Sequence, residues 1–224
     1  MTKLLDLNPD QLLSTTRAVR KRLDFDRPLD IATISECIDV ALQAPSGSNQ
    51  QGWHFFVVTD EDKRKSIGDI YRRGFELYRS LDVSAHKLAE AQTNAADKAQ
   101  MERVVSSAEY LAENMHRAPA LIIPCIDGRM DQVPPAMSVI ANASHYGSIL
   151  PAFWSFMLAC RARGIGTSWT TIHLMFEQEV ADLVGIPFDQ VTQCALSPIA
   201  YTVGTEFKAA RRKSLDGVLH VDSW

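Results

Sequence analysis

One segment of the sequence, residues 147–163, is apolar around nearly its whole helical circumference. Its apolar positions are Ile149, Leu150, Phe153, Trp154, Phe156, Met157, Leu158, Ala159 and Cys160. A helix that is apolar on every side is stable in water only when other parts of the protein, or a second subunit, cover it. The sequence therefore predicts a helix buried in the core or at a subunit interface. Pro151 falls where we expect the first turn, which tolerates proline, and Gly164 ends the helix.

Four other segments have the composition of buried β-strands. They are rich in aromatic and β-branched residues and span 53–58, 120–126, 166–171 and 192–203. Pro124 in the second segment favours an edge strand or a bulge. Helices are predicted after Asn8, which can cap a helix with Pro9 at its first position, after Asp30, and over residues 177–184. No repeat or linker interrupts the chain, so we expect one α+β domain over residues 1–224, with a mixed, mainly antiparallel sheet of four to five strands.

Three stretches do not fit a compact core. Residues 61–117 are helical in pattern but highly charged, with a thin apolar stripe, and a break is expected near residues 80–84. We expect two helices here that form a partly exposed excursion or lid. Residues 127–143 read as a loop, too long to be a mere connection. Residues 204–224 read as an irregular C-terminal tail.

Composition limits the class of protein. The chain has 224 residues, is 46% hydrophobic and 22% charged, and carries a net charge of −4. This charge argues against broad nucleic-acid binding. The four cysteines are far apart inside apolar runs and have no metal-ligand spacing, so they are interpreted as reduced core residues. With no signal-type start and no run of membrane-spanning length, we expect a cytoplasmic protein that binds neither membrane nor metal.

Basic residues gather in two compact clusters. Arg17, Arg20, Lys21 and Arg22 form the first, and Lys208, Arg211, Arg212 and Lys213 form the second. In a mildly acidic protein, such clusters indicate a local anion site, with phosphate the leading candidate. Two solvated basic turns are the alternative that these residues alone leave open.

A polar loop joins a helical pattern to the first strand. It runs Ala44-Pro45-Ser46-Gly47-Ser48-Asn49-Gln50-Gln51-Gly52-Trp53. Small polar residues beside an apolar strand are well placed to hold a small polar ligand, although an ordinary helix-to-strand turn has the same composition. A hydrolase site built on Ser46, His54 and His116 is not supported, because no nucleophile elbow surrounds Ser46.

Taken in order, four segments resemble the FMN-dependent nitroreductase superfamily over nearly the whole chain. They are Thr16-Arg17-Ala18-Val19-Arg20, the loop 44–53, residues 158–169 (LACRARGIGTSW), and residues 211–216 (RRKSLD). The sequence departs from the family pattern in three places. Ala18 replaces a serine of the expected phosphate site, and Gly52 and Ser214 each replace a proline.

The resemblance implies a nitroreductase-like fold and a set of FMN contacts. Arg17, Arg20 and Arg212 would meet at the phosphate, where each charge-assisted hydrogen bond contributes about 1.5–3 kcal/mol. Thr16, Ala18 and Val19 would accompany them. Trp169, Thr170 and Thr171 would lie against the flavin ring, with a backbone N–H of Thr171 or its neighbour at N5. Pro45, Ser46, Gly47, Asn49 and Gln51 would approach the ring from a second subunit.

The resemblance further implies a homodimer with an exchanged C-terminal tail and the flavin at the subunit interface. Its expected activity is that of an oxidoreductase which passes electrons from NADH or NADPH, by a ping-pong mechanism, to a nitroaromatic or quinone. FMN carries the chemistry, so no catalytic side chain is expected.

Two alternatives stay open. One is reductive dehalogenation of the iodotyrosine deiodinase type, although its Glu-x-x-x-Tyr pattern is absent because Glu76 and Tyr78 are only two positions apart. The other is a flavin-binding or flavin-storing protein without turnover, suggested by Ala18. The sequence identifies neither the physiological acceptor nor the preferred nicotinamide.

Overall fold

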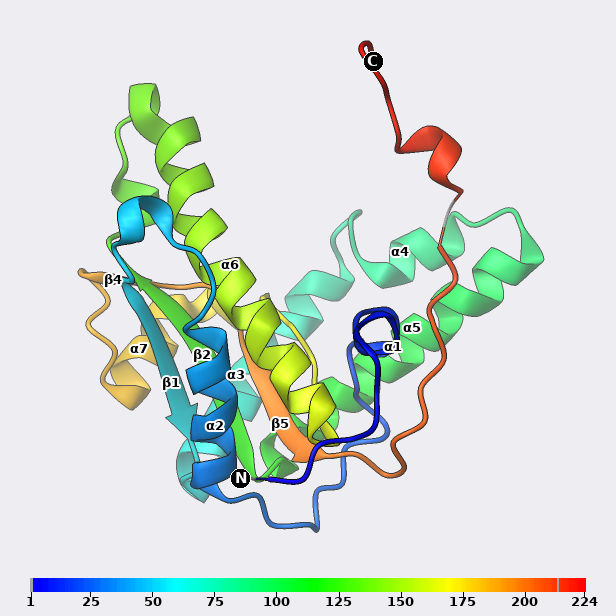
Figure 1. Ribbon diagram of the computed structural model, residues 1–224, viewed down its shortest axis with the longest axis horizontal. Coiled ribbons are helices and arrows are strands. Elements are labelled where there is room, and N and C mark those ends of the chain that lie inside the picture. The colour runs from blue at the N-terminus through cyan, green and yellow to red at the C-terminus, as the bar shows by residue number, and fades with distance from the viewer. Residues whose placement is uncertain (1, 213) are drawn as a thin grey trace.

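The structure is a computed structural model that describes residues 2–212 and 214–224. Its α-helices are α1 (Pro9–Thr15), α2 (Ile31–Ala41), α3 (Glu61–Arg79), α4 (Ala85–Glu90), α5 (Ala95–Asn114), α6 (Ser138–Ala162) and α7 (Glu177–Val184). Its strands are β1 (Trp53–Val58), β2 (Ala120–Asp127), β3 (Ile165–Thr167), β4 (Val191–Gln193) and β5 (Ser197–Tyr201). Figure 1 shows the sheet between two groups of helices, which confirms the predicted α+β class.

The strands form one open sheet in the order β1-β2-β5-β3, with β4 also beside β2. Every pair of these strands is antiparallel. The parallel contact in the described chain is an isolated bridge from Ala18 to Thr167 at the β3 edge. The predicted fourth strand, 192–203, is divided into β4 and β5. The predicted third strand, 166–171, ends at Thr167, because the chain turns away and pairs again only at the Thr170–Leu196 bridge.

Alternation along β2 creates two apolar cores, one on each face of the sheet. Leu121 and Ile123 face the core that also holds α3, α5 and α7. Ile122 faces the core made with α2 and α6. All three side chains are fully buried, and burial of each stabilises the fold by about 1.5–3 kcal/mol. The central strand is therefore hydrophobic at nearly every position.

Pro124 was expected on an edge strand or at a bulge, and the edge alternative is wrong. It lies in β2, which has β1 on one side and both β4 and β5 on the other. The pairing with β5 ends at Ile122, and the pairing with β4 begins at Cys125. Pro124 occupies the gap between them, where its carbonyl accepts a hydrogen bond from the Cys194 N–H at 2.9 Å. A proline is tolerated inside a sheet where the ladder is interrupted.

Helix α6 corrects two predictions. It begins at Ser138, so the expected loop of residues 127–143 is shorter, and Pro151 lies well inside the helix instead of in its first turn. The early turns project beyond the sheet (Figure 1). There Val139 is 86% and Ile140 64% exposed, so the burial pattern that reveals a helix is missing. The predicted burial of the later turns is confirmed, since Phe153 and Phe156 are both fully buried.

The charged stretch 61–117 contains three helices instead of two. Helix α3 is not peripheral, because Ile67, Tyr71 and Phe75 bury one of its faces in the core. Helices α4 and α5 bury much less. Whether they gate a site stays a prediction.

The C-terminal tail leaves the body of the protein after β5 and ends far from it (Figure 1). The apolar side chains toward its end are open to solvent, with Leu215 65% and Trp224 fully exposed. Among the described residues, no helix is both long and apolar enough to cross a bilayer.

Candidate functional site

The first basic cluster lies along the edge strand β3. The Val19 N–H donates to the Thr167 carbonyl at 2.8 Å, which holds this part of the chain against the sheet, and a turn follows at Lys21 and Arg22. A cavity of about 270 Å³ opens over this segment. Its lining is Arg17, Ala18, Val19, Arg20, Lys21, Arg22, Ser107 and Phe207. The Val19 side chain is buried in the core, so only the backbone of this residue remains for a ligand.

Arg20 is the most confined cation of this cavity. Its Nη1 donates to Ser107 Oγ at 3.2 Å, and its Nε is buried with no acceptor among the described residues. Burial lowers the pKa of Arg20, while the nearby Tyr71 partly offsets this effect. Tyr71 lies beneath it, and burial raises the pKa of its phenol to about 12. A desolvated guanidinium with an N–H donor that has no acceptor is suited to bind a charged acceptor such as phosphate.

Arg17 and Arg22 are engaged with the chain that follows β5. Arg17 Nη1 donates to the Lys208 carbonyl at 2.9 Å. Arg22 donates from Nε to the Val203 carbonyl at 2.9 Å and from Nη1 to the Glu206 carbonyl at 2.8 Å. The basic segment thus anchors the start of the tail as well as lining the cavity.

Apart from Lys208, whose backbone carbonyl binds Arg17, the second basic cluster lies away from the first within one chain. Arg211 and Arg212 line a separate cavity of about 370 Å³ beside α5. There Arg211 Nη2 pairs with Asp97 Oδ1 at 3.1 Å. Lys213 lies outside the described residues. The structure therefore brings Arg17 and Arg20 together, but it does not bring Arg212 to them.

The polar loop after α2 has a strained backbone. Ser48, Asn49 and Gln51 all have positive φ, between 51° and 54°. Such conformations are rare for residues other than glycine, and they collect at functional sites. The Ser46 Oγ accepts from the Gln51 N–H at 3.1 Å, and Gln51 Nε2 donates to Asn49 Oδ1 at 3.1 Å. These bonds fix the loop from within.

Gly47 positions this loop against α6. Its N–H donates to Ser148 Oγ at 2.9 Å. A Cβ built on Gly47 would lie 2.4 Å from Ser144 Oγ, so a side chain here would require the Ser144 hydroxyl to move. Pro45 is exposed at the start of the loop.

A second cavity, of about 270 Å³, lies between this loop and α6. Its lining is Ser46, Gln50, Gln51, Gly52, Ile126, Asp127, Ser144, His145 and Ser148. It shares no lining residue with the cavity over residues 17–22. Within one chain, the two halves of the predicted site are therefore separate.

The third predicted segment, residues 169–171, passes from core to surface. The Trp169 ring packs edge-on against Phe153 with centroids 4.8 Å apart. Thr170 is buried, and its Oγ1 donates to the Leu196 carbonyl at 2.8 Å. Thr171 is exposed, and its N–H makes no hydrogen bond within the described part of the chain. This amide is therefore available to a ligand, and its expected role as a donor to flavin N5 stays a prediction.

Sequence reasoning missed several residues of these sites. Ser107 reaches Arg20 from α5, Phe207 covers the basic segment, and Asp127 and His145 line the loop cavity. None lies in a motif. Arg161 belongs to the family-like segment 158–169, but no role of its own was expected for it.

The fold and the sites define an open antiparallel sheet enclosed by helices, with a cationic cavity at one sheet edge and a polar loop at the other. The model of the nitroreductase family matches residues 13–198, and the chain belongs to this family. It is therefore an oxidoreductase.

Across the described residues, no cluster of three or more His, Cys, Asp or Glu residues is arranged to hold a metal ion.

Individual relatives are distant. A 4-nitrobenzoate reductase of Nocardioides sp. (strain LMS-CY) is 23% identical over 202 residues, which cover 84% of this chain and 78% of that protein. A variant of the FMN- and NADPH-dependent nitroreductase NfnB from Sphigopyxis sp. strain HMH superposes with a TM-score of 0.67 at 19% identity, covering 97% of this chain and all of that one. Iodotyrosine deiodinase bound to FMN and 3-iodo-L-tyrosine gives a TM-score of 0.64 at 18% identity, covering 93% and 96%.

Proposed function

We propose that this chain binds FMN and passes electrons from NADH or NADPH to a small aromatic acceptor, such as a nitroaromatic or a quinone. The observation that carries the proposal is the cationic cavity over residues 17–22 in a member of the nitroreductase family. The names of the relatives, which include a 4-nitrobenzoate reductase and an FMN- and NADPH-dependent nitroreductase, support the class of cofactor and acceptor.

The residues present fit the phosphate end of FMN. Arg20 carries a buried Nε without an acceptor, and Arg17 and Lys21 line the same cavity. Paired charge-assisted hydrogen bonds from guanidinium to phosphate are strong and directional. Ala18 is exposed and contributes no hydroxyl, so arginine carries the recognition here.

The residues at the end of β3 fit the ring. When bound, FMN supplies the redox chemistry, taking a hydride from the nicotinamide and giving electrons to the second substrate in alternation. The protein's part is to orient the ring and to stabilise its charge. The free Thr171 N–H can donate to a ring nitrogen, and Thr170, fixed by Leu196, holds that amide in place.

A homodimer would complete the site. The loop of residues 45–51 and the cavity over residues 17–22 are separate in one chain, and a second chain can bring its loop to the ring. The exposed early turns of α6 and the exposed apolar tail offer surface for that contact. A tail exchanged between subunits would also allow Arg212 to reach the phosphate.

The first experiment is to record the visible spectrum of the purified protein and to identify the released flavin. Anaerobic addition of NADH or NADPH should bleach the flavin spectrum, and a quinone or nitroaromatic should restore it. A yellow protein that no nicotinamide reduces would instead support flavin storage. Sedimentation of the yellow protein as a monomer of about 25 kDa would contradict the dimer.

The dehalogenase alternative is tested by adding iodotyrosine to the reduced flavoprotein and measuring the release of halide. Glu76 contacts Arg79 on the surface of α3. The Tyr78 hydroxyl accepts a hydrogen bond from the Ala85 N–H at 2.8 Å. These two side chains are thus engaged elsewhere. We expect no halide release from iodotyrosine, and release coupled to flavin oxidation would favour the alternative.

A further inference from the structure

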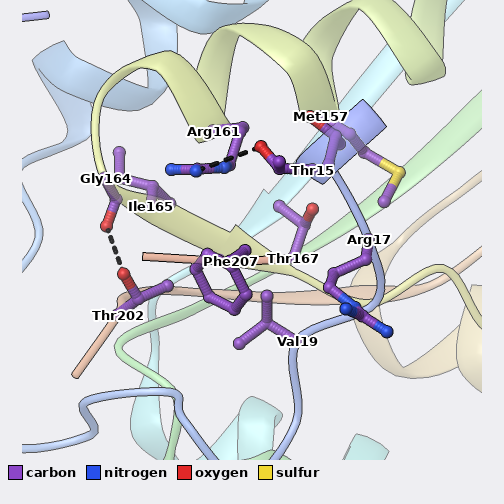
Figure 2. A pocket seen from close by; sticks show the side chains of 12 residues that line it. Thr15, Arg17, Val19, Met157, Arg161, Gly164, Ile165, Thr167, Thr202 and Phe207 are labelled. Atoms are coloured by element: carbon purple, nitrogen blue, oxygen red, sulfur yellow. Dashed lines mark hydrogen bonds between the residues drawn. The ribbon is translucent and has the colours of Figure 1, made fainter. Parts of the chain in front are cut away.

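Arg161 is a cation in the interior of the protein. It lies in the last turn of α6 and is only 5% exposed. Figure 2 shows its guanidinium directed toward a small pocket between α6, β3 and the chain after β5. An arginine is charged at every pH at which the protein is folded, so this pocket contains a permanent positive charge.

The guanidinium is poorly satisfied by the protein. Its Nη2 donates to Thr15 Oγ1 at 3.2 Å. Its Nε and Nη1 are buried and have no acceptor among the described residues. Phe207 lies over it, with the Arg161 Cζ 5.0 Å from the ring centroid. Buried donors of a charged group are costly to leave without an acceptor.

The surrounding charges do not compensate it. No carboxylate of the described residues lies within ion-pair distance of Arg161. Glu206 acts from farther away and is opposed by Arg22, and burial lowers the pKa of Arg161. Arg17 lines the same pocket. The dipole at the C-terminal end of α6 offsets only part of this positive charge.

The remaining lining of the pocket combines threonines with apolar residues and glycines. It includes the threonines Thr15, Thr16, Thr167 and Thr202, beside Val19, Met157, Gly164, Ile165, Gly166 and Phe207. The cavity measures about 10 Å³, which is the space of about one water-sized sphere. A phosphate or carboxylate does not fit. Monatomic anions are the class of anion that this volume admits with a small shift of flexible walls such as Met157.

We propose that this pocket binds a halide ion, chloride under ordinary conditions, held by the Arg161 guanidinium. The site is distinct from the cavity proposed for the FMN phosphate, although Arg17, Val19 and Phe207 form a shared wall. The bound ion neutralises the buried charge and stabilises the contact between α6 and the residues around Phe207. The inference does not depend on the proposed function, because it rests on the buried cation and its pocket.

The test compares halide with a large anion at equal ionic strength. The Tm of the purified protein is measured in 0.5 M sodium chloride, bromide or gluconate. We expect chloride and bromide to raise the Tm by about 2–4 °C over gluconate, the response to a weakly bound ligand in a protein of this size. The difference should vanish in Arg161→Met, which keeps an unbranched side chain without donors.

Arg163→Met is the matched control. Arg163 also lies at the end of α6, but its Nη1 donates to the Ala159 carbonyl at 3.1 Å and its Nε contacts Glu36 at 3.4 Å. This variant should lose stability yet keep the halide difference. Equal Tm values in halide and gluconate for the wild type would overturn the proposal.

A crystal grown in bromide keeps the proposal testable even if Arg161→Met does not fold. We expect an anomalous bromide peak within hydrogen-bonding reach of the Arg161 guanidinium. A water molecule at that place, with no anomalous signal, would show that water satisfies the donors and that the halide site does not exist.

Discussion

The guanidinium carbon of Arg22 lies 4.1 Å from the centre of the Phe207 ring. Arg161 approaches the same ring at 5.0 Å, so Phe207 is held between two cations, one from the basic segment and one from α6. Arg22 and Arg17 also bind backbone carbonyls on both sides of Phe207. The segment that begins the tail is therefore anchored to the residues that line the proposed phosphate cavity.

This anchor predicts the behaviour of Phe207→Ala. Loss of the ring removes a cation–π contact of about 0.5–2 kcal/mol together with packing on the basic segment. We expect hydrogen exchange to rise in residues 203–212 and the free energy of unfolding to fall by about 1–3 kcal/mol. Phe207→Tyr keeps the ring and should change neither measurement. Unchanged exchange in the alanine variant would show that the backbone contacts suffice.

Flavin affinity should depend on Arg20. Arg20→Ala removes a partly buried cation that lines the cavity, so we expect the Kd for FMN to rise by about tenfold or more. Arg22→Ala should matter far less, because the donors of Arg22 are occupied by tail carbonyls. Lys65→Ala, an exposed cation that lines neither cavity of the candidate site, is the control. Fluorescence titration of flavin-free protein measures all three, and equal affinity for Arg20→Ala and wild type would refute the phosphate assignment.

His173 should make stability depend on pH. It is fully buried, and neither ring nitrogen has a hydrogen-bond partner among the described residues. Burial lowers the pKa of His173 to about 3, with Gln193 offsetting a small part. In the unfolded chain the pKa is about 6.5, so between these values the unfolded state binds more protons. Stability contributed by the neutral imidazole is therefore present above pH 6.5 and is lost as the pH falls toward 3.

The expected loss is about 1.5–2 kcal/mol between pH 6.5 and pH 5. Urea unfolding at several pH values measures it. His173→Met, which has no titrating group, should show a correspondingly shallower dependence over this range. An equal slope in the variant would assign the acid sensitivity to other groups.

Two helical glycines should respond oppositely to alanine. A Cβ at Gly74 of α3 would lie 2.9 Å from the Ile172 carbonyl oxygen, whereas a Cβ at Gly147 of α6 would have nothing within 4 Å. Gly147→Ala should stabilise the fold by about 0.5–1 kcal/mol through helix propensity. Gly74→Ala should destabilise it by about 1–3 kcal/mol, because α3 could no longer approach the chain after Thr171. Thermal unfolding of both variants checks the signs. A destabilised Gly147→Ala would indicate that a second subunit covers that surface.

Local chemistry in the sequence was enough to predict much of the fold. The Asn8 cap with Pro9 after it starts α1, Asp30 caps α2, and Gly185 in the left-handed conformation ends α7. These outcomes follow from hydrogen bonds and backbone conformations within a few residues. Two of the four family-like segments, 16–20 and 44–53, each contribute to the lining of one of the two cavities.

Tertiary structure decided everything that depends on distant parts of the chain. Pro124 lies in a central strand because β4 and β5 leave a gap beside it, and no neighbour in sequence encodes that gap. The first turns of α6 were not predicted from the sequence, because they bury almost no apolar surface and so show no helical burial pattern. Arg161 is buried because Thr15 and Phe207, at opposite ends of the chain, close over it. Sequence patterns report contacts between near neighbours, whereas burial of a charge and the meeting of two segments are set by long-range packing.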